Sequence, residues 1–213
     1  MSAPVVDLWR ADLDVEPGGP DLELLLSPDE RDRAARARTA TLRHRWMASR
    51  AALREVLAGY LGVAPAALAF ETAARGKPSV VDHPDLRFNL AHAEGVALIG
   101  VSLDAEVGVD VEAVRPGLRE EAIARRVLGL DAWTALATLE GAERTAAFFV
   151  RWARHEAAVK CAGNGLFDVP ATSSSVTVVD VGAGEGFAAA LAVAGASAPS
   201  VRERVWNPGG SGA

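Results

Sequence analysis

The chain contains almost no lysine. Lys77 and Lys160 are the only two in 213 residues, against twenty arginines. Arginine carries a planar guanidinium that stays charged, whereas lysine carries a compact ammonium whose pKa its surroundings can shift. Two isolated lysines therefore indicate either two positions that require an ammonium, or drift in a composition that avoids lysine.

Cysteine and long apolar runs are also scarce. Cys161 is the single cysteine, which excludes an intrachain disulfide and favours a reducing compartment. At the apolar end of a helix, Cys161 is expected to be a buried structural thiol. No apolar run is long enough to span a bilayer and no leader opens the chain, so we expect a cytoplasmic protein without a membrane partner.

The charge balance limits the partners. A net charge of −6 argues against a dedicated nucleic-acid-binding protein. It leaves room for a local basic site that takes an anionic small molecule. Nine basic residues crowd into one short segment, which is either a set of solvated helix faces or such a site: Arg31, Arg33, Arg36, Arg38, Arg43, His44, Arg45, Arg50 and Arg54.

The order of the predicted elements indicates an α+β fold. A strand pattern at VVDLWRADL precedes a helix that begins at SPDERDRAARA, where Ser27 can cap and Pro28 suits the first helical position. A long amphipathic helix is predicted over 41–61, and a second over 143–162. Short strands lie between the two helices and close the chain, with tight connections that favour antiparallel sheets.

The two halves of the chain look alike. We predict an N-terminal α+β subdomain over 1–104, a C-terminal α+β subdomain over 105–207, and a disordered tail over 208–213. Each subdomain is expected to pack a small antiparallel sheet against one long helix. This is a pseudo-duplicated arrangement, although no sequence repeat proves duplication.

The stretch GVDVE, residues 108–112, places two carboxylates on one face of a strand. Side chains alternate along a strand, so Asp110 and Glu112 face one way while Val109 and Val111 face the other. Two buried carboxylates repel each other unless one takes a proton or a cation lies between them. Mg²⁺ prefers such oxygen ligands, but for this pattern taken alone a solvated strand face is the better explanation.

The helix over 143–162 carries a second group of polar side chains. Trp152, Glu156 and Lys160 are spaced by four and share a face. Spacing alone favours an ordinary amphipathic edge. The functional alternative makes Glu156 an oxygen ligand or general base and Lys160 an acid or phosphate clamp. His92, at the end of the strand FNLAH, is likewise either solvated or a donor to a phosphate at a pocket mouth.

Together these stretches resemble the 4'-phosphopantetheinyl transferase superfamily. GVDVE matches the family's G-[IV]-D-[IV]-E strand, and WARHEAAVK, followed by GNGL, matches its W-x-x-K-E-[AS]-x-x-K helix. GKP, FNLAH and SPDERDRAARAR match further elements. The resemblance spans about 27–167 and is to the larger, single-chain Sfp-type members, which serve peptide and polyketide synthesis. Both lysines fall on motif positions, which favours function over drift.

The resemblance implies a reaction and its residues. Such enzymes move the phosphopantetheine arm of coenzyme A onto a serine of an apo acyl or peptidyl carrier protein. They depend on Mg²⁺ and release adenosine 3',5'-bisphosphate. The implied ligands of Mg²⁺ are Asp110, Glu112 and Glu156. The implied catalytic residues are Glu156, Lys160 and His92. The implied contacts to coenzyme A are Arg45 at the 3'-phosphate end, together with Lys77, His92, His155 and Lys160.

Two departures from the family pattern leave alternatives open. His155 stands where the family carries lysine, and Ala91 precedes His92 where some members carry serine. A weaker or pH-sensitive contact to coenzyme A is expected at His155. A homologue that binds coenzyme A or a carrier without turnover is the second hypothesis, and a metal-dependent pyrophosphate hydrolase is the third. We expect a monomer.

Overall fold

A computed structural model of the protein describes residues 3–14, 21–72, 76–117, 120–163 and 175–209. Part of the GNGL stretch and most of the predicted tail over 208–213 lie outside these residues. None of the helices in the described ranges combines the length and the apolar character needed to cross a membrane.

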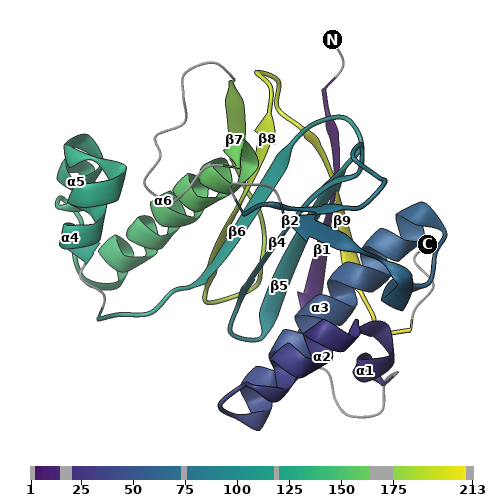
Figure 1. Cartoon of the computed structure of the whole chain (residues 1–213). Helices are drawn as coiled ribbons and strands as arrows, with labels where there is room; N and C mark the ends of the chain where they lie inside the picture. Colours follow the sequence, from purple (N-terminus) through teal and green to yellow (C-terminus); the bar gives the residue numbers. More distant parts are fainter. Residues whose placement is uncertain (1–2, 15–20, 73–75, 118–119, 164–174, 210–213) are drawn as a thin grey trace.

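Two sheets lie face to face, and each carries a long helix on its outer face (Figure 1). The first sheet has the order β4-β5-β1-β9 and the second has the order β6-β8-β7. The first consists of β1 (Val5–Asp12), β4 (Arg87–Ala93), β5 (Val96–Ser102) and β9 (Ser200–Trp206). The second consists of β6 (Val107–Ala113), β7 (Val176–Asp180) and β8 (Phe187–Ala194). The fold is therefore α+β, as predicted.

The helices and the remaining strands lie around these sheets. The helices are α1 (Leu22–Leu25), α2 (Pro28–Ala35), α3 (Ala40–Leu61), α4 (Glu120–Ile123), α5 (Leu130–Leu136) and α6 (Gly141–Ala162), with a 3₁₀ turn at Pro65–Ala67 and a π-helical turn at Ala124–Leu128. A small ribbon pairs β2 (Phe70–Thr72) with β3 (Pro78–Val80). The two long helices were predicted to within two residues of their ends. Ser27 caps α2 in a capping box with Glu30, as its sequence indicates.

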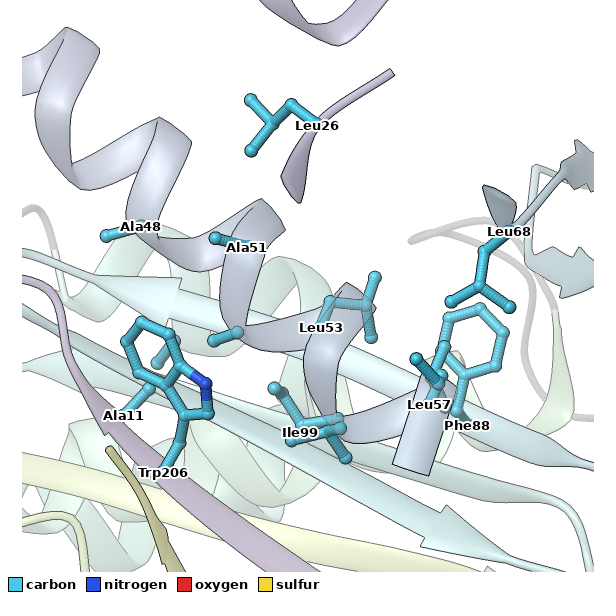
Figure 2. Close-up of a cluster of buried hydrophobic side chains, with 14 of the residues drawn as sticks. Ala11, Leu26, Ala48, Ala51, Leu53, Leu57, Leu68, Phe88, Ile99 and Trp206 are labelled. Atoms are coloured by element: carbon cyan, nitrogen blue, oxygen red, sulfur yellow. The ribbon is translucent and has the colours of Figure 1, made fainter. Parts of the chain in front are cut away.

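The core between α3 and the first sheet follows from strand alternation. Ala11 of β1 and Ile99 of β5 face α3, whose small residues Ala48 and Ala51 let the helix lie close (Figure 2). Side chains of the opposite parity, such as Leu8 and Leu98, face the second sheet instead. All seven residues of β5 are buried, so this strand is the centre of the molecule.

The last strand joins the first sheet and not the second. β9 pairs in parallel with β1, although its sequence lies in the predicted C-terminal subdomain. Trp206 explains part of this choice, because its ring is buried under α3 and its Nε1 donates to Glu55 at 2.9 Å. The predicted boundary near residue 104 falls between β5 and β6. The likeness of the two halves, each with one 22-residue helix on a sheet, stays a prediction.

A buried ion pair fixes α2 against α3. The guanidinium of Arg54, 2% exposed, donates to Glu30 at 2.5 Å and to the carbonyls of Pro65 and Leu68 at 2.7 and 3.0 Å. Arg50 donates to the same carboxylate at 2.8 Å. Burial raises the pKa of Glu30, but the Ser27 backbone N–H and the two arginines outweigh it and lower that pKa.

We predict that Glu30→Gln lowers the free energy of unfolding by about 3 kcal/mol near neutral pH, because it leaves a buried guanidinium without its counter-charge. Urea unfolding measures this. Glu23→Gln is the control, since Glu23 pairs with Arg43 at 3.1 Å on the surface and should cost under about 1 kcal/mol. Equal losses in the two variants would contradict the prediction.

The contribution of the Glu30 carboxylate to the free energy of unfolding depends on pH. Because the folded pKa of Glu30 lies below its usual value of 4.5, its contribution is complete above that value and lost as the pH falls through the folded pKa. The difference in the free energy of unfolding between the wild type and Glu30→Gln should therefore narrow as the pH falls below 4.5.

Candidate functional site

The two carboxylates of β6 face α6. Val107, Val109 and Val111 point between the two sheets, and Asp110 and Glu112 have the opposite parity. The prediction that the acids share one face is confirmed. This face is the one that α6 covers, so the carboxylates are partly or wholly buried.

Glycine at position 108 lets α6 approach β6. A Cβ atom there would lie 2.1 Å from the carbonyl oxygen of Ala157 and 2.3 Å from the backbone nitrogen of Cys161. No side chain fits at such distances. Ala190 and Ala192 of β8 continue the same close contact with small side chains. The first glycine of GVDVE therefore sets how near the carboxylates come to the helix.

Across this contact, Lys160 of α6 meets Asp110 of β6. The Lys160 Nζ donates to Asp110 Oδ1 at 2.5 Å. Asp110 is 4% exposed, and its Oδ2 has no hydrogen-bond partner within the described chain. Burial raises the pKa of Asp110, and the Lys160 charge pulls it back only in part. A buried carboxylate oxygen without a partner retains its capacity to accept a cation or a donor.

Two further carboxylates lie within electrostatic reach of this pair. Glu112 Oε1 accepts from Trp152 Nε1 at 3.0 Å. Burial raises the pKa of Glu112, and the Asp110 charge adds to the effect. Burial also raises the pKa of Glu156, where Lys160 opposes the shift while Asp110 and Glu112 reinforce it. The predicted helix face of Trp152, Glu156 and Lys160 thus meets the predicted strand face of Asp110 and Glu112.

The acidic group is compatible with a divalent cation but is not arranged around one. No three His, Cys, Asp or Glu side chains in the described ranges form a group that could hold a metal ion. The Lys160 ammonium is the cation that contacts Asp110. The all-oxygen donor set, the orphaned Oδ2 and the mutual repulsion of the three acids fit Mg²⁺ chemically. The three-ligand assignment stays a prediction.

His92 connects this group to the first sheet. β4 and β6 are the edge strands of the two sheets and run beside each other (Figure 1). The buried amide of Asn89 joins them, because its Oδ1 accepts from the Val109 N–H at 2.9 Å. Three residues further along β4, His92 lies close enough to Lys160 for that charge to lower its pKa. Partial burial of the ring lowers this pKa more strongly than Lys160 does, although the residue is still exposed to solvent.

A cleft of about 970 Å³ opens from His92 toward α2 and α3. Arg33, Arg36 and Arg45 bring positive charge to its lining, and Trp46 brings an aromatic surface. The lining residues are Asp29, Asp32, Arg33, Ala34, Arg36, Ala37, Leu42, Arg45, Trp46, His92, Ala93 and Glu94. Guanidinium groups and an aromatic face suit a phosphate-bearing ligand with a planar base. Arg50 and Arg54, by contrast, belong to the ion pair with Glu30.

Lys77 and His155 lie differently from the other predicted site residues. Lys77 Nζ donates to Glu106 at 2.6 Å and to the Val107 carbonyl at 2.9 Å, at the start of β6. It does not line the cleft. The His155 ring lies 6.1 Å from that of Trp152, and its buried Nε2 has no hydrogen-bond partner in the described residues. Their predicted contacts to coenzyme A stay predictions.

The sequence alone did not single out several residues that shape the site. Asn89 was recognised only as part of FNLAH, and Asp14 and Glu94, which contact Arg45, were not predicted. The buried polar position of Asn89 in an apolar strand was the available signal. Cys161 is buried as expected, and burial raises its pKa to about 11, so the thiol stays neutral.

The fold and the site define a class of protein. The stacked sheets bring a cleft lined by three arginines, three acids and a tryptophan beside buried carboxylates and an ammonium. Such an arrangement suits the transfer of a phosphorus-containing group. Comparison with known proteins narrows this class. The family model of the 4'-phosphopantetheinyl transferase superfamily matches residues 106–189, which contain the carboxylate strand and the lysine helix.

Relatives from three bacteria agree with the family model. The 4'-phosphopantetheinyl transferase HetI of Nostoc sp. is 37% identical over 76% of this chain and 70% of its own. The transferase psf-1 of Bacillus pumilus is 30% identical over 68% of this chain and 61% of its own. Sfp of Bacillus subtilis is 28% identical over 71% of this chain and 66% of its own. The chain belongs to the 4'-phosphopantetheinyl transferase superfamily and is a transferase.

We predict that Gly108→Ala destabilises the protein by at least about 2 kcal/mol, because the new methyl group meets helix backbone that cannot yield without moving α6. Urea unfolding measures this. Gly59→Ala is the matched control, since a methyl group added at Gly59 of α3 meets nothing within 4 Å among the described residues, and alanine favours a helix. A Gly108→Ala protein as stable as the wild type would refute the close approach.

Proposed function

We propose that this protein transfers the 4'-phosphopantetheine arm of coenzyme A to a serine of an apo acyl or peptidyl carrier protein and releases adenosine 3',5'-bisphosphate. The observation that carries the proposal is the meeting of Lys160 with Asp110 beside Glu156, next to a cleft with three arginines. Membership of the family supports the general reaction.

The cleft and the carboxylate group suit the two ends of coenzyme A. The nucleotide end carries phosphates that Arg33, Arg36 and Arg45 would attract, and Trp46 offers a surface for the base. His92 lines the cleft and also feels the Lys160 charge, so a pyrophosphate near His92 would reach both. His155 would contact the bound substrate only if its buried Nε2, which has no partner in the described residues, became accessible.

The chain's own groups suit the proton transfers. Attack by the carrier serine oxygen forms a new phosphorus–oxygen bond and breaks the pyrophosphate bond to the adenosine bisphosphate. Glu156, which lies within reach of the Lys160 charge, would take the serine proton. Lys160 would donate to the leaving phosphate, which gains negative charge. Lysine suits this role because its ammonium can give up a proton.

Asp110, Glu112 and Glu156 are the residues that would hold Mg²⁺. When bound, such an ion would neutralise charge on the pyrophosphate and on the acids themselves. The orphaned Asp110 Oδ2 and the raised pKa values support this assignment, because the acids lack sufficient positive charge of their own.

We predict that Glu156→Gln lowers the transfer rate at least about 100-fold without reducing stability, because the amide cannot accept the serine proton. Holo-carrier formation measures the rate, and urea unfolding checks the fold. Glu143→Gln is the control on the same helix, where Glu143 is exposed and thirteen residues away, roughly 20 Å along the axis. A fully active Glu156→Gln enzyme would remove this residue from the mechanism.

We predict a mass gain equal to one phosphopantetheine when a panel of apo carrier proteins is incubated with the enzyme, coenzyme A and Mg²⁺. A chelator should abolish the gain and added Mg²⁺ restore it, because three acids share one ammonium. Intact-protein mass spectrometry measures it. Binding of coenzyme A without any mass gain would favour the non-catalytic homologue. Adenosine bisphosphate release without a carrier would favour the hydrolase.

A further inference from the structure

Arg45, on the wall of the cleft, is held between two carboxylates. Its Nε and Nη2 donate to the two oxygens of Asp14 at 2.7 and 2.8 Å, and its Nη1 donates to Glu94 at 3.1 Å. A guanidinium has five N–H donors, so these bonds engage three and leave two for a ligand. We call Asp14, Arg45 and Glu94 the clamp.

The backbone next to the clamp has two unusual features, at Gly95 and at Glu94. A Cβ atom at Gly95 would lie 2.4 Å from Asp14 Oδ2, so a side chain there would displace the Asp14 carboxylate from its present position. Glu94, the preceding residue, has φ of 49°, a left-handed conformation that non-glycine residues seldom adopt. The β4–β5 turn thus accepts a strained residue in a position that brings its carboxylate to Arg45.

The contribution of this arrangement to the stability of the fold is modest. The side chains of Asp14 and Glu94 are 50% and 54% exposed, and exposed ion pairs contribute little to folding. The hydrogen bonds from Arg45 lower the pKa of Asp14, so its carboxylate is ionised at neutral pH. Arg45 therefore faces two negative charges, of which Glu94 also has Arg115 Nη1 at 3.9 Å. This end of the cleft attracts an anion less than the arginine alone would.

We propose that Asp14 and Glu94 compete with the 3'-phosphate of coenzyme A for Arg45, and so lower the preference of the site for the 3'-phosphorylated ligand. The inference rests on the proposed function, with coenzyme A as the ligand. A carboxylate within a Debye length of a phosphate dianion weakens its binding roughly three- to tenfold. The leaving adenosine 3',5'-bisphosphate carries the same phosphate, so the clamp also speeds release of this product.

Two effects of removing a carboxylate oppose each other. Loss of Asp14 removes repulsion, but it also frees the Arg45 side chain to adopt other rotamers. Asparagine limits the second effect, because its amide oxygen still accepts from Arg45 and Glu94 still holds Nη1. Asp14→Asn is therefore the variant that isolates the charge.

The test compares coenzyme A with 3'-dephospho-coenzyme A by titration calorimetry at low salt. Asp14→Asn should bind coenzyme A three- to tenfold more tightly than the wild type and bind the dephospho form within twofold of it. The affinity of Glu94→Gln for coenzyme A should also rise, but by a smaller factor, because Glu94 accepts one hydrogen bond from Arg45 whereas Asp14 accepts two. In the transfer assay, the KM for coenzyme A should fall with Asp14→Asn.

Glu23→Gln is the matched control. It removes a carboxylate that pairs with Arg43, also on α3, and that does not line the cleft. Its affinities for both ligands should equal those of the wild type. Thermal unfolding of each variant confirms the fold.

Three outcomes would overturn the inference. Unchanged or weaker binding of coenzyme A by Asp14→Asn would show that the carboxylate orients Arg45 and does not compete with the ligand. Equal tightening of both ligands would show a general charge effect without selection for the 3'-phosphate. In both cases transfer by the wild type would leave the proposed function intact. A wild type that binds neither ligand would remove the proposed function and the inference with it.

Discussion

The candidate site depends on how closely α6 lies on β6. A helix backbone meets a strand backbone at Gly108, and this contact brings the Lys160 ammonium to the buried Asp110 carboxylate. A larger separation would weaken the pairing of the buried Asp110 carboxylate with the partly exposed Lys160 ammonium, and a buried carboxylate without its partner costs several kcal/mol. Packing and electrostatics are therefore coupled here, since the apolar seam of Ala157 and Ala190 stabilises the position that the charges require.

The electrostatics of the site are unbalanced. Asp110, Glu112 and Glu156 share the Lys160 charge, to which Arg115 adds only at Glu112, and the pKa of each acid is raised. Such a group gains from any additional positive charge, whether a metal ion or a proton. In the cleft nearby, by contrast, the positive charge of Arg45 is already paired with two carboxylates. One end of the site lacks positive charge, and the other holds its arginine partly neutralised.

The two ends are joined through side chains at the edge between the sheets. Asn89 accepts the Val109 N–H and Lys77 donates to the Val107 carbonyl, so β4 and the chain before it are tied to backbone groups on the edge of β6 that faces away from β8. These bonds fix His92 relative to Asp110. They also give Lys77 a structural role, in addition to whatever contact with the substrate it makes. Both of the chain's lysines therefore contact β6. Lys77 binds at its start, and Lys160 binds at its acidic face.

Much of this was readable from the sequence, because it depends on local periodicity. Alternation in GVDVE predicted that Asp110 and Glu112 share a face, the spacing of four predicted the α6 face, and Ser27 and Pro28 predicted the start of α2. The family motifs indicated the class of enzyme. Only the tertiary structure decided that β9 returns to pair with β1, that Glu30 neutralises Arg54, and that Asp14 and Glu94 enclose Arg45. Those contacts join residues far apart in the chain, and no local pattern encodes which distant partner satisfies a charge or a strand edge.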